Sequence, residues 1–177
     1  MSIVIAGAFV IATFLVVALL TFGTVLGTST NQGASLQEAS DRQVGQALGA
    51  IAITSTNAAN SGEGTNITVT GDNTGAMSYG SFSAMDVLAK YTNSTGDQEI
   101  KRLAYVCKQL CGNPGNPGDN EWTIFSINPD SYNPKMWDPN ENATISLRVV
   151  PSVKTGTSGT VAVVVPDGIS DSAYFNN

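Results

Sequence analysis

The N-terminal apolar segment constrains the fold of this chain more than any other feature. Residues 3–26 read IVIAGAFVIATFLVVALLTFGTVL, and the first charged side chain of the protein is Glu38. As a helix the segment would be about 36 Å long, against roughly 30 Å of bilayer hydrocarbon. Fifteen of its side chains are apolar and larger than alanine, and the burial of each contributes ~1.5 to 3 kcal/mol. Lipid or other helices must therefore cover this segment.

The segment differs from a secretory signal peptide. No basic residue precedes it, its apolar core is longer than that of a signal peptide, and no small-residue cleavage site follows it at a polar boundary. We therefore expect the segment to be retained in the functional protein rather than cleaved as a signal peptide. A plain membrane anchor is the simplest interpretation of such apolarity.

Small residues repeat at a spacing of four along the segment and beyond it, which lets helices approach closely. Residues 36–51 continue a helical pattern in which apolar residues recur every three or four positions. The sequence thus predicts a long N-terminal hydrophobic helix over residues 1–53, as a filament core or a membrane anchor. The candidate helix-core residues are Ile3, Ala8, Phe9, Ala12, Leu15, Leu19, Gly23 and Gly27.

The rest of the chain changes to a period of two. Residues 54–64 have no periodicity and many small polar side chains, which is typical of a linker. Over residues 65–177, six or seven short alternating segments predict the strands of an antiparallel β-sandwich. The whole chain is therefore predicted to be an α+β protein with one helical part and one outer domain. The alternating apolar positions are Ile67, Val69, Met85, Val87, Ala89, Tyr91, Leu103, Tyr105, Cys107, Trp122, Ile124, Ile145, Leu147, Val149, Val161, Val163 and Val165.

Cys107 and Cys111 are the two cysteines of the chain. A tetrahedral zinc site would lack ligands, because the chain has no histidine and no further thiol. A disulfide is favoured if the domain lies outside the cytoplasm, and two free buried thiols are the alternative.

Three glycosylation sequons occur, at Asn66, Asn93 and Asn142. This number is expected by chance in a chain so rich in Asn, Ser and Thr. An exposed turn makes Asn93 a plausible acceptor.

Residues 128–141, NPDSYNPKMWDPNE, hold three carboxylates, three prolines and a tryptophan. Acid and base catalysis by Asp130, Asp138 and Glu141 would need a cleft that a domain of this size lacks. A cation loop would lack the dense acidic spacing and the glycine of an EF-hand. The prolines and the aromatic side chains instead favour a rigid connector between strands, or an interface.

The charge pattern and composition argue against nucleic-acid binding and against an enzyme. The net charge is −6, the eight Lys and Arg are scattered singly, and charged residues make up 12% of the chain. Nothing in this pattern favours binding to nucleic acid. No catalytic, metal or cofactor-binding set stands out, so we expect a non-enzymatic protein without a cofactor.

Three parts of the chain occur together in a recognisable order. They are the apolar head, NITVTGDNTGAMSYGSFSAMDVLAKYTN, and the stretch from WTIFSINPD through MWDPNENATISL to VVVPDGI. Together they resemble the archaellin superfamily of archaellum proteins. The likeness covers nearly the whole chain. The resemblance implies a type IV pilin-like subunit with a helix in a filament core and a β-sandwich facing outward. It also implies as partners identical subunits, a membrane before assembly, a platform and a motor ATPase.

The resemblance implies two roles, the polymerising subunit of the motility filament and a membrane-anchored stator protein whose β-sandwich binds the cell envelope. Archaellin precursors carry a short basic leader before the apolar helix, and none precedes Met1. If Met1 is the encoded start, this favours the stator or an unusual archaellin, and if the chain is in its processed form, the objection to a filament subunit lapses. The long helix bearing small residues suits packing among many neighbours. We therefore expect an extracellular filament subunit, with the stator as the alternative.

Overall fold

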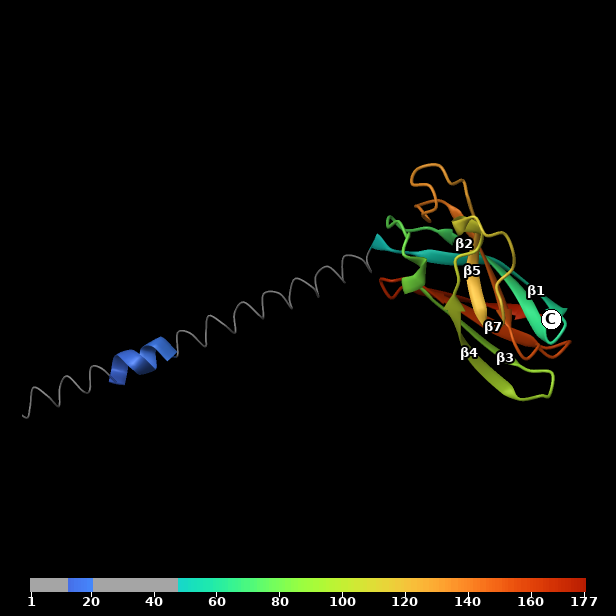
Figure 1. Cartoon of the computed structure of the whole chain (residues 1–177), viewed down its shortest axis with the longest axis horizontal. Helices are drawn as coiled ribbons and strands as arrows, with labels where there is room; N and C mark the ends of the chain where they lie inside the picture. The colour runs from blue at the N-terminus through green and yellow to red at the C-terminus, as the bar shows by residue number, and fades with distance from the viewer. Residues whose placement is uncertain (1–12, 21–47) are drawn as a thin grey trace, which may run out of the picture. The chain divides into compact units, whose positions relative to one another are not determined.

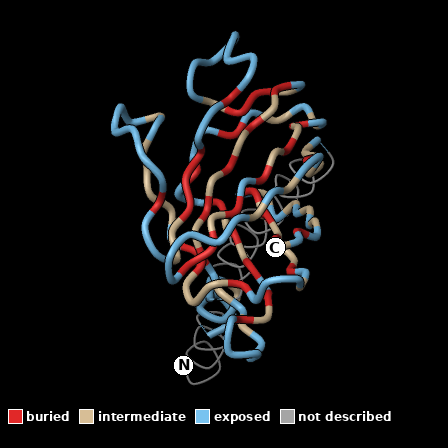
Figure 2. The backbone as a smooth tube through the Cα atoms, turned by 90° about the vertical axis from the view of Figure 1, so that its right-hand side faces the viewer, coloured by how far each residue is buried: buried red, intermediate tan, exposed pale blue. Residues whose placement is uncertain are grey.

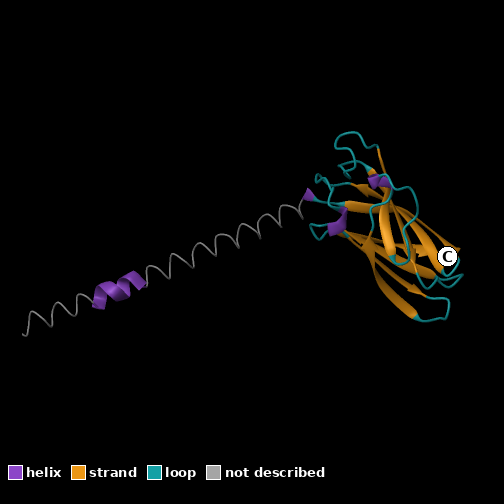
Figure 3. Ribbon diagram, in the orientation of Figure 1, coloured by secondary structure: helices purple, strands orange, loops and turns teal. Residues whose placement is uncertain are grey.

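A computed structural model describes residues 13–20 and 48–177, and β-strands dominate the second of these ranges (Figures 1 and 3). Residues 13–20 are helical. The described residues 48–177 belong to one compact unit. The strands are β1 (Ile51–Ser61), β2 (Gly64–Asn73), β3 (Asp86–Thr92), β4 (Gln98–Tyr105), β5 (Glu121–Asn128), β6 (Asn142–Val149), β7 (Ser158–Val164) and β8 (Ser170–Asn176), with short 3-10 helices η1 (Phe82–Ala84) and η2 (Gln109–Cys111).

The eight strands form one nearly closed sheet with the order β1-β2-β6-β5-β4-β3-β7-β8. All neighbours pair antiparallel except β4 and β5, which meet in a short parallel contact. The two end strands also touch, because the Ile53 N–H donates to Asp171 Oδ2 over 2.7 Å and the Thr56 hydroxyl donates to the Tyr174 carbonyl over 2.8 Å. The predicted β-rich domain is confirmed, with one eight-stranded sheet in place of a sandwich of six or seven strands.

The core lies between β1-β2-β6-β5 and β4-β3-β7-β8, the two antiparallel halves of the sheet, and appears as the buried strand segments in Figure 2. Alternation predicted this core well, since nearly every apolar position of the predicted strands is buried. Tyr105 and Cys107 are half-buried instead. The period-two pattern worked because one face of each of these strands packs inward while the other meets solvent.

The prediction for residues 51–64 is wrong. Neither a helix ending near Ile53 nor a linker over residues 54–64 is present, because β1 covers Ile51–Ser61 and turns directly into β2. Most β1 side chains beyond Ile53 are exposed, so a backbone ladder to β2 holds this strand rather than a buried face. The strand β8 was missed for the same reason, since Phe175 is its one buried side chain.

The predicted helix over residues 1–53 lies mostly outside the described residues. Residues 13–20 are helical, as expected. In the part of the chain that the structure describes, no helix has both the length and the apolarity to cross a membrane. Six candidate helix-core residues lie outside the described residues, namely Ile3, Ala8, Phe9, Ala12, Gly23 and Gly27.

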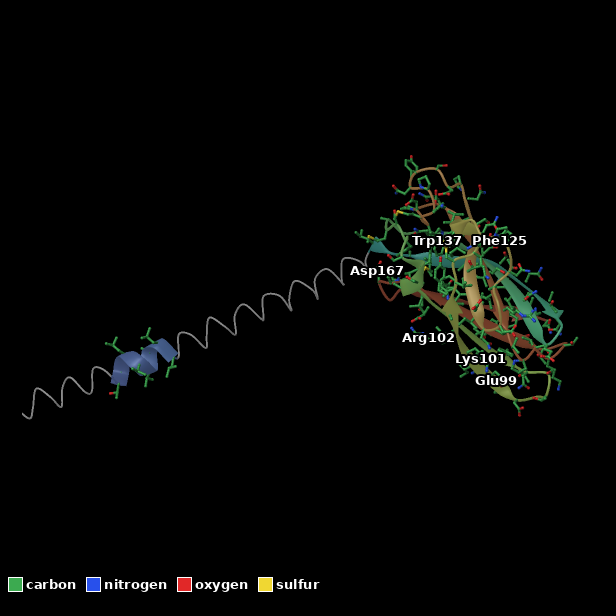
Figure 4. The ribbon with its side chains drawn as sticks, viewed as in Figure 1. Glu99, Lys101, Arg102, Phe125, Trp137 and Asp167 are labelled. Atoms are coloured by element: carbon green, nitrogen blue, oxygen red, sulfur yellow. A yellow bond between two sulfur atoms is a disulfide. The ribbon has the colours of Figure 1, made fainter. Side chains whose placement is uncertain are left out.

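Charged side chains lie along β4, a strand with one partly free edge. This strand contacts β5 through Ala104 and Tyr105 alone, which leaves most of its edge without a strand partner. Lys101 lies 3.2 Å from Glu99 along the strand, and Arg102 lies 2.6 Å from Asp86 on β3. Charged side chains on an open edge discourage pairing with another chain. Glu99, Lys101 and Arg102 are labelled on β4 in Figure 4.

A disulfide joins Cys107 and Cys111, whose Cα atoms lie 5.7 Å apart. The bridge closes the turn that contains η2, immediately after β4. Of the three alternatives for these cysteines, the structure thus has the bonded pair, and it contains no free cysteine among the described residues.

Removing this bridge should destabilise the domain modestly. Because it closes a loop with a sequence separation of only 4, the Cys107→Ser/Cys111→Ser double variant is expected to lose about 2 kcal/mol of unfolding free energy. Urea unfolding followed by tryptophan fluorescence measures this loss, and reductant should lower the stability of the wild type to the same extent. A double variant as stable as the oxidised wild type would contradict the expectation.

Candidate functional site

The helix over residues 13–20 presents a continuous apolar surface. Six of its large side chains are between 56% and 76% exposed, namely Phe14, Leu15, Val16, Val17, Leu19 and Leu20. A helix that is apolar on all sides is normally buried in protein or lipid. Burying a side chain of this kind contributes ~1.5 to 3 kcal/mol. This segment is therefore the first candidate site, an apolar surface that protein or lipid could cover.

Leu15 and Leu19 are the two candidate helix-core residues within the described part of the chain. They are 57% and 71% exposed and lie four residues apart, so their side chains project from one face of the helix. A neighbouring helix could cover both side chains with a single contact.

Residues 128–141 connect β5 to β6 and form the second candidate surface. The backbones of Tyr79 and Trp137 exchange two hydrogen bonds, with N to O distances of 3.0 Å and 2.8 Å. Trp137, labelled in Figure 4, is 1% exposed, and its indole N–H donates to the Glu141 carbonyl over 2.9 Å. The tip residue Tyr132 is 85% exposed. The connector is thus anchored at its tryptophan and presents an aromatic tip to solvent.

The three carboxylates of the connector accept hydrogen bonds from its own backbone. Asp130 Oδ1 accepts from Lys135 N at 2.8 Å. Asp138 Oδ2 accepts from Asn133 N, also at 2.8 Å. Glu141 accepts from Ser131 N and Asp138 N at 3.2 Å and 3.0 Å. These bonds tie each carboxylate to the backbone of the connector, which fits the interpretation as a rigid connector.

No group of three or more His, Cys, Asp or Glu side chains that could hold a metal ion is present within residues 13–20 and 48–177.

Asp138 should make the stability of the connector depend on pH. Hydrogen bonds from Ser78 and Asn133 lower the pKa of its carboxyl below the ordinary value of 3.8. The folded state therefore binds fewer protons than the unfolded state in this range, so the stabilisation is complete above about pH 4 and is lost as the pH falls through the lowered pKa.

Asp138→Asn tests this dependence. The variant should be less stable than the wild type at pH 7, and the difference should shrink as the pH is lowered below 4. Urea unfolding at pH 7, 5 and 3 measures the difference. A difference that stays constant over this range would show that ionisation of Asp138 contributes nothing.

The structure changes the interpretation of one glycosylation sequon. Asn93 is only 4% exposed, contrary to the expected exposed turn. Its side-chain oxygen accepts hydrogen bonds from Thr95 and Asp97, and its amide donates to Glu99 over 3.3 Å. Asn66 and Asn142 are half-buried on β2 and β6, where they contact Arg148 and Asp72 respectively. Asn66 and Asn142 are thus less buried than Asn93.

Sequence reasoning missed Asn73, which ties the connector to β2. Its side-chain amide donates to the carbonyls of Met77 and Trp137 over 2.7 Å and 2.9 Å, and the residue is fully buried. Its backbone also exchanges hydrogen bonds with Glu141 and Asn140. The signal for such a role was the Asn-Thr-Gly turn that begins at this residue.

Comparison with known proteins identifies a similar fold among solved structures. No protein-family model matches the chain, and no curated protein matches its sequence. The structure of the archaeal flagellum of Methanospirillum hungatei strain JF1 is similar, with a TM-score of 0.56 and 14% sequence identity, over 97% of this chain and 92% of that chain. The fold is archaellin-like.

Two further solved structures are archaellum components. The archaellum periplasmic stator protein FlaG from Sulfolobus acidocaldarius is 17% identical, with a TM-score of 0.48 over 72% of this chain and 100% of that chain. The stator complex of FlaF and FlaG from the same organism is 16% identical, with a TM-score of 0.44 over 70% and 90%. Such low scores do not bear on whether an archaellin-like chain is a filament subunit or a stator.

Proposed function

We propose that this chain is the structural subunit of an archaellum-type motility filament. It polymerises with identical copies through its N-terminal helix, and its β-domain faces outward on the cell surface. The observation that carries the proposal is the row of exposed apolar side chains over residues 14–20, which requires a permanent cover. The archaellin-like fold, shared with a filament over 97% of the chain, supports it.

The proposed mechanism is assembly rather than chemistry. Before assembly the apolar helix lies in the cytoplasmic membrane, where lipid covers Leu15 and Leu19. The platform and motor ATPase that the resemblance implies would extract the subunit and dock it beneath the growing filament. Lipid contacts are then exchanged for helix contacts, which dispersion forces and small residues at the interfaces favour. The apolar surface stays covered throughout.

The outer domain fits a passive structural role. Its connector carboxylates accept backbone hydrogen bonds that hold the connector in place. The net charge of −6 keeps neighbouring filaments apart and soluble. No enzymatic activity is part of the proposal.

The alternative is a membrane-anchored stator whose β-domain binds the cell envelope. Shearing the native cells and comparing the sheared fraction with the membranes separates the two roles. A filament subunit should be abundant in the sheared fraction, whereas a stator should stay with the membranes. Retention of nearly all of the chain in the membranes, with filaments made of another protein, would overturn the filament proposal.

A further inference from the structure

A hollow of about 250 Å³ lies on the outward face of β2, β6 and β5. Five residues line it, namely Thr68, Asn116, Phe125, Thr144 and Ser146. Thr68 on β2 faces Ser146 on β6, and Thr144 lies two residues away along β6. The loop before β5 supplies Asn116. Three strands and one loop thus build the hollow.

A β-bulge turns the aromatic ring of Phe125 outward. The pairing of β5 with β6 shifts between Ile124 and Ser126, so the alternation of the strand is broken at Phe125. Phe125 and Ser126 are consecutive and both exposed, and Phe125 is 43% exposed. Bulges commonly redirect a side chain at a functional position. Phe125, labelled in Figure 4, therefore supplies a partly exposed apolar ring to the hollow.

The other lining side chains are neutral and available for hydrogen bonds. Three hydroxyls and one amide face the hollow, and together they can donate and accept. Within the described residues, none of these four side chains forms a hydrogen bond to another part of the chain, in contrast to the engaged carboxylates of the connector.

The five lining residues carry no charge, and two charged side chains on the same strands are already hydrogen-bonded. Arg148 donates to Asp119, Asn66 and the Ser61 carbonyl over distances of 2.7 to 3.1 Å. Asp72 accepts from the amide of Asn142 at 2.6 Å. An ionic ligand would find no free opposite charge at the hollow. A wholly apolar ligand would cover four polar groups without giving them partners, which costs free energy.

We propose that this hollow binds a neutral saccharide. A sugar ring presents an apolar C–H face, which can pack on the Phe125 ring, and hydroxyls, which can bond to Thr68, Thr144, Ser146 and Asn116. Its size suits one or two sugar rings, since pockets for larger ligands begin at about 300 Å³. The inference does not depend on whether the chain is a filament subunit or a stator.

The saccharide could come from this protein or from another surface. Thr68 and Thr144 are the third residues of the sequons at Asn66 and Asn142, so a glycan on either asparagine would begin beside the hollow. A glycan on a neighbouring cell or subunit would reach the same exposed face. Both sources present the same chemistry.

Ligand-observed saturation-transfer NMR tests the proposal on the full-length, unglycosylated chain. The chain is kept in phosphocholine micelles, because maltoside detergents carry sugars. The probes are maltotriose, cellotriose and triacetylchitotriose, with glucuronate as the charged control. At least one neutral trisaccharide should bind, and Phe125→Ala should weaken binding about three- to tenfold. Ser146→Ala should weaken it as well, and neither change alters a sequon.

Tyr174→Ala is the matched control, since it removes an aromatic side chain that is 78% exposed on β8 and leaves the hollow intact. Failure of all three trisaccharides to bind, or equal binding by wild type and Phe125→Ala, would overturn the proposal.

Peptide mass spectrometry of the native protein identifies the source of the saccharide. Hexoses on Asn66 or Asn142, with reduced binding of added trisaccharide, indicate an internal ligand, and unmodified peptides indicate an external one.

Discussion

Leu15→Lys is expected to abolish filament formation. Leu15 lies in the middle of the apolar row and is 57% exposed, and in the proposed filament other subunits cover it. A lysine at the centre of an apolar helix costs about 2.5 to 3.5 kcal/mol on insertion scales. In a polymer this cost recurs in every subunit, with the charges held close together in one core. Electron microscopy of the sheared fraction, together with a swimming assay, measures the outcome.

Leu15→Met is the matched control, because it conserves volume and apolarity and should cost less than about 1.5 kcal/mol. Cells with this variant should still make filaments. Immunoblots of the membranes must show that the lysine variant is present there, so that loss of filaments reflects failed assembly rather than failed insertion. Filaments of normal length built from the lysine variant would show that this helix is not in the filament core.

Trp137→Ala is expected to remove about 3 to 5 kcal/mol from the stability of the β-domain. The indole ring is 1% exposed, packs at 6.1 Å from the ring of Tyr79, and closes the connector through its bond to the Glu141 carbonyl. The smaller side chain would leave a cavity at the end of the core and release the connector. Urea unfolding followed by the fluorescence of the second tryptophan, Trp122, reports the loss.

Trp137→Phe separates packing from hydrogen bonding. Phenylalanine keeps most of the buried ring, and the Glu141 carbonyl still accepts from Asn73 N at 3.0 Å, so the loss should be about 1 to 2 kcal/mol. Equal stabilities for wild type and Trp137→Ala would mean that the connector does not contribute to the core.

The sequence predicted the parts of the fold that depend on side-chain burial. Ile145, Leu147 and Val149 alternate because β6 lies in the interior of the sheet with one face in the core. The prediction from the sequence failed at β1, where TSTNAANS has the composition of a linker. Backbone pairing with β2 holds that strand, and few of its side chains are buried. Pairing between backbones leaves little trace in a hydrophobic pattern.

Among the candidate sites, the apolar segment could be predicted from the sequence, whereas the sites that depend on long-range contacts could not. The apolarity of residues 3–26 is visible in the sequence without knowledge of any tertiary contact, so Leu15 and Leu19 could be chosen as candidates from the sequence. The hollow at Phe125 depends on the register of three strands and on a bulge, which a single sequence does not specify. The role of Asn73 likewise depends on the connector, more than sixty residues away in sequence, folding back beside it.

The most direct test of the filament proposal is a reconstruction by electron cryomicroscopy of filaments sheared from the native cells, combined with peptide mass spectrometry. We expect peptides of this chain to dominate, and we expect the map to show apolar helices packed at the centre with eight-stranded β-domains outside. Filaments of another protein, with this chain confined to the membranes, would contradict the proposal and support the stator role.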